Sequence, residues 1–335
     1  MGAGERERNM DSRMNRRDFI SMATFGAGAV VATASLPALG DSAPTAFVPA
    51  DSGRARMSLA YQHIHIGLPK PFSVLHISDT HLAECYPTEP PHKVEFAAKR
   101  MRGFGGRQVE ALRSSIAWAK ENADLLIHTG DLIDFQTEAN LDFVRKMFGE
   151  GNALAASMGN HEYQRRNVDE PIRHATEYND LSTAKLSSAY PFDISVQSTE
   201  VFGVNFVTMD QVYGFVTAKQ VERFAAEVKK GLPIVLCMHV PLFTDHIWLI
   251  HERFWRYRWK KFRIDTLPNP NGDYKRQQED KTTRDFIAYL KSEPLLKGVL
   301  TGHLHIAIQD RFSPTAMQYV VGGNFMFHGQ EILFT

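Results

Sequence analysis

Residues 128–134 read HTGDLID: an apolar run ends, and two carboxylates, Asp131 and Asp134, follow at once. A single acid after a strand is an ordinary turn residue, so this stretch decides nothing alone. Four further apolar runs end in the same way, with DTH at 79–81, GNHE at 159–162, a lone His239, and GHLH at 302–305. In an open α/β sheet the loops at the carboxyl ends of the strands converge on one crevice. The five polar groups are therefore predicted to face the same place.

The rest of the chain alternates strand and helix patterns, which predicts the α/β fold class with later antiparallel pieces completing the sheets. The predicted helices are 109–122, 140–148, 217–230 and 282–293. The predicted strands are 61–68, 72–78, 124–129, 153–158, 201–209, 233–238, 297–301, 306–311 and 317–321.

The residue types after the strands are those of a binuclear metal site. Carboxylates, an amide oxygen and neutral imidazoles suit Mn, Fe or Zn, whereas the absence of thiolates argues against a structural zinc site. Glycines at 130, 159 and 302 would let the chain turn sharply and bring backbone close to the metals. In DTH and HLH the paired residues stand two apart, and in an extended chain both would point to one side.

The five blocks, in this order over residues 79–305, resemble the calcineurin-like metallophosphoesterase superfamily, whose blocks are D-x-H, G-D-x-x-D, G-N-H-D/E, H and G-H-x-H. The resemblance implies a layered sandwich of two mixed β-sheets flanked by helices. It also implies two divalent or trivalent metal ions. The implied ligands are Asp79, His81 and His305 for one metal, Asn160, His239 and His303 for the other, and Asp131 as the bridge.

The resemblance further implies that His161 lies beside the substrate without binding metal, oriented by Asp134 and supported by Glu162. Two divalent ions, two carboxylates and a bridging hydroxide leave one positive charge, which suits an anionic phosphoryl group. We therefore predict in-line attack of that hydroxide on phosphorus, with His161 protonating or hydrogen-bonding the leaving oxygen. The alternative is a saturated metal site that only holds loops together. Seven ligands over two metals leave open positions, which favours catalysis.

Two inserted stretches, 84–107 and 244–281, are possible caps over the site. In the first, Arg100, Arg102 and Arg107 surround a glycine segment and would clamp a second phosphate, unless 93–107 is simply a charged, mobile loop. In the second, Trp255 and Arg256 belong to an aromatic and cationic stretch, 246–263, that would shape a substrate pocket. The competing interpretation of that stretch is an amphipathic helix packed into the domain.

The N-terminus has the layout of an export signal. A pair of arginines in NRRDFI (15–20) precedes an uncharged stretch rich in small residues, and this resembles a twin-arginine signal read by a translocase for folded proteins. We predict a signal peptide at 1–40, a linker at 41–60, a single domain at 61–335, and a periplasmic or extracellular location. The alternative, a membrane anchor, is disfavoured by the glycines, threonines and proline of the stretch. Cys85 and Cys237 are predicted to be free thiols.

The favoured function is a phosphodiesterase that acts on a small nucleotide or lipid head group. The stretch after GDLID lacks the Arg-Gly of the protein phosphatases, and Asp134 stands where purple acid phosphatases carry tyrosine. A nuclease of the same superfamily is the first alternative, but zero net charge and an export signal argue against nucleic acid as partner. A non-catalytic metal-dependent binding protein is the second, and it would require a missing ligand or a missing His161.

Overall fold

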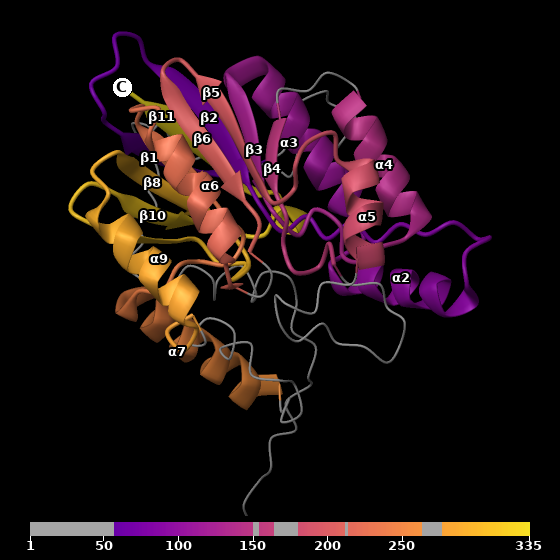
Figure 1. The fold of residues 1–335 in the computed structure, drawn as a ribbon. Coiled ribbons are helices and arrows are strands. Elements are labelled where there is room, and N and C mark those ends of the chain that lie inside the picture. The colour runs from indigo at the N-terminus through magenta and orange to yellow at the C-terminus, as the bar shows by residue number, and fades with distance from the viewer. Residues whose placement is uncertain (1–56, 150–153, 164–179, 212–213, 263–276) are drawn as a thin grey trace, which may run out of the picture. The chain divides into compact units, whose positions relative to one another are not determined.

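Two mixed β-sheets form the centre of the computed structural model, which describes residues 57–149, 154–163, 180–211, 214–262 and 277–335 (Figure 1). All of these residues belong to one compact unit. The predicted signal peptide (1–40) and most of the predicted linker (41–60) lie outside the described residues.

The first sheet has the strand order β1-β11-β2-β3-β4, in which β2, β3 and β4 run parallel. Its strands are β1 (Ser58–Ile64), β2 (Phe72–Ile77), β3 (Leu125–Thr129), β4 (Leu154–Ser157) and β11 (His328–Phe334). The second sheet has the order β5-β6-β7-β8-β10-β9, with β6, β7, β8 and β10 parallel. Its strands are β5 (Val196–Val201), β6 (Val204–Met209), β7 (Ile234–Cys237), β8 (Leu296–Thr301), β9 (Ile308–Arg311) and β10 (Met317–Val320).

The sheets face each other through an apolar core, because the buried strands carry apolar side chains on both faces. In β7, Val235 and Cys237 join the core between the sheets, whereas Ile234 and Leu236 pack with the helices outside. The stacked rings of Phe72 and Phe334, with centroids 4.9 Å apart, belong to the inner core. The predicted sandwich of two mixed sheets flanked by helices is thus confirmed.

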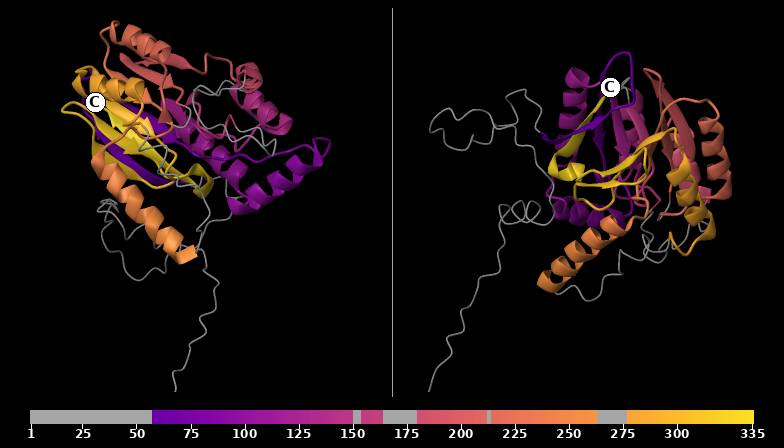
Figure 2. Two further views of the ribbon diagram at one scale, coloured as in Figure 1. Left: turned by 60° about the horizontal axis from the view of Figure 1, so that its bottom comes forward. Right: turned by 90° about the vertical axis from the view of Figure 1, so that its left-hand side faces the viewer.

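Helices cover the outer face of each sheet (Figures 1 and 2). The first sheet packs against α3 and α4 through residues such as Leu112 and Val144, and the second packs against α6 and α9 through Phe224 and Phe286. The helices are α2 (Pro91–Gly103), α3 (Gln108–Asn122), α4 (Glu138–Gly149), α5 (Asp180–Ala189), α6 (Ala218–Val228), α7 (Asp245–Phe262), α9 (Lys281–Ser292) and the short 3₁₀ turn η4 (Asn324–Met326).

The structure corrects two sequence-based expectations. Strand β1 begins at Ser58, inside the predicted linker, because 58–64 pairs in parallel along the whole of β11. Residues 93–103 are helical rather than a mobile loop, since Pro91 occupies the first turn of α2 and basic residues complete its last turn. The glycines that suggested a loop follow the helix, where Gly105 and Gly106 adopt positive φ. Strands β5 and β11 were not predicted.

Both cysteines are free, as predicted, and Cys237 is buried in β7. Among the described residues, no helix is both long enough and apolar enough to cross a bilayer.

Candidate metal centre

The predicted ligands all lie in loops that follow strands of the two sheets. Asp79 and His81 follow β2, Asp131 follows β3, and Asn160 follows β4, three adjacent parallel strands of the first sheet. His239 follows β7, whereas His303 and His305 follow β8, its parallel neighbour in the second sheet. The parallel pairing brings these loops to one edge of the sandwich, as the sequence predicted.

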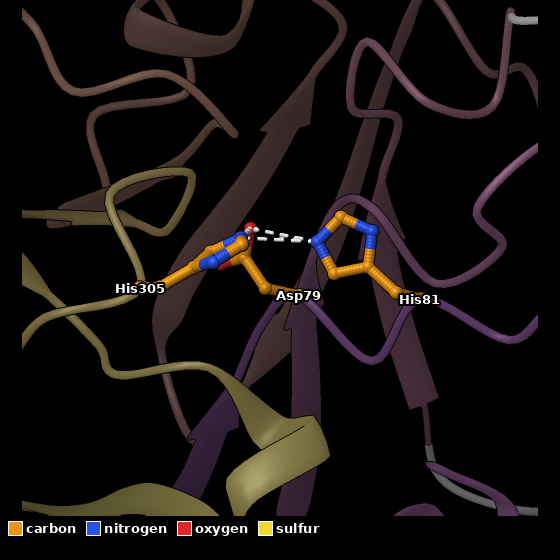
Figure 3. A group of neighbouring side chains, drawn as sticks. All are labelled: Asp79, His81 and His305. Carbon is orange, nitrogen blue, oxygen red and sulfur yellow. Dashed lines mark hydrogen bonds and ion pairs between the residues drawn. The ribbon is translucent and has the colours of Figure 1, made fainter. Parts of the chain in front are cut away.

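Asp79, His81 and His305 form the first candidate ligand group (Figure 3). The Nε2 atoms of His81 and His305 lie 3.0 Å apart, and His305 Nε2 lies 3.2 Å from Asp79 Oδ1. His81 Nε2 lies 3.7 Å from Asp131 Oδ2, so this carboxylate borders the first group. These distances suit donor atoms that surround one cation.

Asp131, His239 and His303 form the second group. His239 Nε2 lies 3.1 Å from Asp131 Oδ2 and 3.2 Å from His303 Nδ1. The same oxygen of Asp131 therefore faces ligands of both groups, which is the geometry of a bridging carboxylate. Asn160 lies in the loop beside Asp131, and its buried Oδ1 has no hydrogen-bond partner among the described residues.

Hydrogen bonds at Nδ1 direct Nε2 of two histidines towards the centre. His81 Nδ1 lies 3.0 Å from Asp134 Oδ1, and His239 Nδ1 lies 2.8 Å from the carbonyl oxygen of Thr129. Both partners only accept, so each Nδ1 carries the proton and each Nε2 presents a lone pair when the ring is neutral. Burial lowers the pKa of His81 to about 4, which keeps its ring neutral at neutral pH.

The backbone around the site is strained. Of the seven non-glycine residues with positive φ among the described residues, five are predicted ligands, namely Asp79, His81, Asp131, His303 and His305. The left-handed conformation is unfavourable for residues with a Cβ and concentrates at functional sites. The expectation that DTH and HLH are extended is therefore wrong: each pair converges because both of its residues turn left-handed.

Glycines allow the loops to approach one another. A Cβ atom at Gly159 would lie 2.2 Å from Asp131 Oδ1, and one at Gly302 would lie 2.5 Å from Asp79 Oδ2. At Gly130, where φ is +89°, it would lie 2.7 Å from the backbone nitrogen of Gly159. Any larger residue would force the ligand loops apart, which agrees with the role that the sequence suggested for these glycines.

Buried hydrogen bonds tie the loops together. The Glu162 carboxylate accepts N–H bonds from Asp131, Leu132, Ile133 and Gly159, at distances from 2.6 to 3.3 Å. Burial and the nearby Asp131 carboxylate raise the pKa of Glu162 to about 7, and the four N–H donors oppose that shift by favouring the charged form. Across the sheets, His303 donates its backbone N–H to Asp79 Oδ2 at 2.8 Å.

A second network of buried hydrogen bonds holds the turn formed by residues 79–81. Thr80 Oγ1 lies 2.9 Å from His128 Nε2 and donates to Asn324 Oδ1 at 3.0 Å. His76 Nε2 lies 2.8 Å from Thr129 Oγ1. Burial lowers the pKa of both His76 and His128 to about 3, so they are neutral structural residues, and neither belongs to a candidate ligand group.

His161 lies beside the first group. Its ring centroid is 4.7 Å from that of His81, and its Nδ1 lies 2.8 Å from the Asp134 carbonyl and 3.0 Å from Asp134 Oδ1. Burial lowers the pKa of His161, but the Asp131 and Asp134 carboxylates outweigh burial and raise it to about 9. Asp134 thus holds His161 as the sequence suggested, and it holds His81 as well.

Among the suggested substrate-binding residues whose side chains are described, Arg100 lies at the site, where its guanidinium pairs with the buried Asp134. Arg102 is exposed on α2. Trp255 and Arg256 lie in helix α7, but their side chains fall outside the described residues. Sequence reasoning missed Phe104, whose ring stacks on His81 at 4.3 Å, and Phe325, whose ring centroid lies 5.2 Å from that of His305.

The residues fit a pair of metal ions. Imidazole nitrogens and carboxylate oxygens converge in these overlapping groups, and the amide oxygen of Asn160 is buried without a hydrogen-bond partner among the described residues. Burial raises the pKa of Asp79 and Asp131, yet neighbouring histidines outweigh it and hold both well below the usual range, so both stay charged. Carboxylate and imidazole ligands without thiolate suit Mn, Fe or Zn.

A two-sheet sandwich with Asp and His side chains clustered at its strand ends can hold a pair of metal ions. The family model for calcineurin-like phosphoesterases matches residues 72–307, and the chain belongs to this family. It is therefore a member of a family of metal-dependent phosphoric ester hydrolases, with a buried candidate dimetal site.

Solved structures with similar folds include a dimetal phosphatase from Danio rerio, with 13% identity, a TM-score of 0.46, and coverage of 76% of this chain and 88% of that one. A 5'-nucleotidase from Candida albicans has 14% identity and a TM-score of 0.37, and the match covers 80% of this chain but 48% of the nucleotidase. With TM-scores below 0.5, these likenesses carry no argument about activity or substrate. No curated protein matches the sequence.

Proposed function

We propose that the protein is a phosphodiesterase that acts on a small nucleotide or on a lipid head group. The observation that carries this proposal is the shared Asp131 oxygen, 3.1 Å from His239 Nε2 and 3.7 Å from His81 Nε2, with His161 at its side. Two metal ions held there would polarise a phosphoryl group and lower the pKa of water towards about 7. The single positive charge expected from such a centre matches the single negative charge of a phosphodiester.

The chain's own residues supply the proton for the leaving group. The Asp134 carboxylate accepts a hydrogen bond from Nδ1–H of His161. This bond orients the ring so that Nε2 points away from Asp134 and can reach the leaving oxygen. The pKa of about 9 favours a protonated ring at neutral pH, although two bound cations would lower it. His161 therefore acts as general acid, and Asp134 sets its orientation.

We further propose that the protein is exported by the twin-arginine translocase and acts in the periplasm or outside the cell. Support comes from Arg16 and Arg17, followed by an uncharged stretch of small residues. Replacing both arginines by lysine should keep the protein in the cytoplasmic fraction. Unchanged secretion would contradict this part of the proposal.

The experiment compares hydrolysis of bis(p-nitrophenyl) phosphate and p-nitrophenyl phosphate by protein loaded with Mn or Zn. We expect faster cleavage of the diester. Asp131→Asn should abolish activity and lower bound metal, whereas His161→Asn should lower turnover with metal content intact. Faster cleavage of single-stranded DNA would favour the nuclease alternative. Metal-loaded protein that leaves every ester intact would favour the binding protein.

A further inference from the structure

Helix α2 contributes a cation to the metal centre through Arg100. Its guanidinium donates to both oxygens of Asp134, from Nε at 2.5 Å and from an Nη at 2.7 Å. The Asp134 side chain is fully buried, while that of Arg100 is 29% exposed. Asp134 Oδ1 in turn lies 3.0 Å from Nδ1 of His81 and of His161.

The same helix leads to a second contact one turn later. The Phe104 ring stacks on the His81 ring at 4.3 Å between centroids with an interplanar angle of 11°, and the Arg100 guanidinium lies 4.7 Å from the Phe104 centroid. His81 is thus held at Nδ1 by the carboxylate that Arg100 binds, and on its ring face by Phe104.

We propose that Arg100 and Phe104 are positioning residues, through which helix α2 fixes the metal ligand His81 and the general acid His161. This inference rests on the proposed function. It replaces the idea that Arg100 clamps a second phosphate, because the forked guanidinium is already engaged by both oxygens of a buried carboxylate. A residue with this role affects turnover and metal binding, whereas a phosphate clamp would mainly affect KM.

The physical reason is the geometry of Asp134. One carboxylate must orient two imidazoles, and the planar guanidinium fork fixes the plane of that carboxylate by binding both oxygens. Without Arg100 the carboxylate would be buried with less compensation and free to rotate between the two rings. Groups that orient metal ligands typically affect metal affinity or activity about 10–100-fold when removed.

The test uses the full protein with Arg100→Ala, Arg100→Lys, Phe104→Leu and, as matched control, Lys99→Gln at an exposed position of the same helix. We expect Arg100→Ala to lower kcat about 10–100-fold with little change in KM. Lysine keeps the charge but not the fork, so Arg100→Lys should recover only part of the activity. Added guanidinium should restore turnover of Arg100→Ala, and Lys99→Gln should match the parent protein.

Titration with Co²⁺ alone gives a readout that does not depend on turnover. We expect weaker binding and an altered visible spectrum for Arg100→Ala and Phe104→Leu, with circular dichroism unchanged. A higher KM with parental kcat in Arg100→Ala would overturn the proposal in favour of a phosphate clamp, and parental Co²⁺ spectra in both variants would overturn it as well. If the parent protein hydrolyses no ester, the proposed function fails, but the Co²⁺ spectra still decide the positioning role.

Discussion

Gly159→Ala should separate the ligand loops that follow β3 and β4. An added Cβ would lie 2.2 Å from Asp131 Oδ1 and 2.5 Å from the Asp131 backbone nitrogen. Carbon and oxygen pack at about 3.5 Å, so the loops would have to move apart by roughly 1 Å. Because one of the colliding atoms belongs to the backbone, rotation of a side chain cannot relieve the contact.

The shift would weaken two hydrogen bonds beside the contact, the 2.7 Å bond from the Gly159 N–H to Glu162 and the 2.9 Å bond from the His161 N–H to Asp131 Oδ1. Overpacking of this kind typically costs about 1–3 kcal/mol. Misplacement of a catalytic centre by about 1 Å can lower the rate roughly 100-fold. We therefore expect a lower midpoint in urea denaturation, less bound metal, and at least a tenfold loss of diester hydrolysis.

Gly149→Ala is the matched control, because no atom lies within 4 Å of a Cβ at that position, which is exposed at the end of α4. Gly149→Ala should leave metal content and hydrolysis unchanged. It should raise the free energy of unfolding by up to about 1 kcal/mol, because alanine reduces the backbone freedom of the unfolded chain. A Gly159→Ala protein with parental stability, metal content and turnover would refute the role assigned to the close approach of these loops.

Three further predictions concern charge and protons. Glu162→Gln removes an acceptor from buried N–H groups, so it should lower the free energy of unfolding by about 1–3 kcal/mol or more, and an unchanged urea midpoint would contradict the role of Glu162 in tying the loops together. The pKa values of His76 and His128 are lowered to about 3, below the value of about 6.5 in the unfolded chain. Below about pH 6.5 the unfolded chain therefore binds protons that the folded protein does not. For each of the two histidines, the free energy of unfolding should fall by about 1.4 kcal/mol per pH unit between about pH 6.5 and about pH 3. Urea denaturation of the metal-free protein at pH 7 and pH 5.5 measures this loss, which should shrink in His128→Asn. Burial lowers the pKa of His239, but Asp131 outweighs burial and raises it to about 10, so metal binding at pH 7 should release a proton. Calorimetry in two buffers of different ionisation enthalpy would detect that proton, and equal heats in both would argue against His239 as a ligand.

The placement of the ligands followed from the sequence, because buried strands are recognisable and the polar residues after them must leave the sheet at one edge. Asp79, Asp131 and His303 were located by that logic without knowledge of any contact between them. The left-handed backbone at these residues was not predictable, because Asp and His tolerate it better than most residues with a Cβ but seldom adopt it. Only the surrounding loops, together with glycines that permit their approach, impose it.

The role of helix α2 was hidden for a different reason. Its sequence intersperses charged and apolar residues and buries only Ala97, so the usual amphipathic signal is weak. The partners Arg100 and Asp134 are 34 residues apart, and the pairing depends on where the helix packs. The stacking of Phe104 on His81 likewise arises from tertiary structure alone.

The position of β11 between β1 and β2 has a consequence for biogenesis. Strand β11 pairs in parallel with β1 on one side and antiparallel with β2 on the other. Both β1 and β2 are synthesised long before β11, so neither can complete its pairing until β11 has been made. Until the ribosome has released residues 328–334, β2 lacks its neighbour on that side and β1 has no partner in the sheet. The first sheet is therefore completed only after translation has passed residue 334, and a chain truncated before that point would leave two strand edges exposed to aggregation.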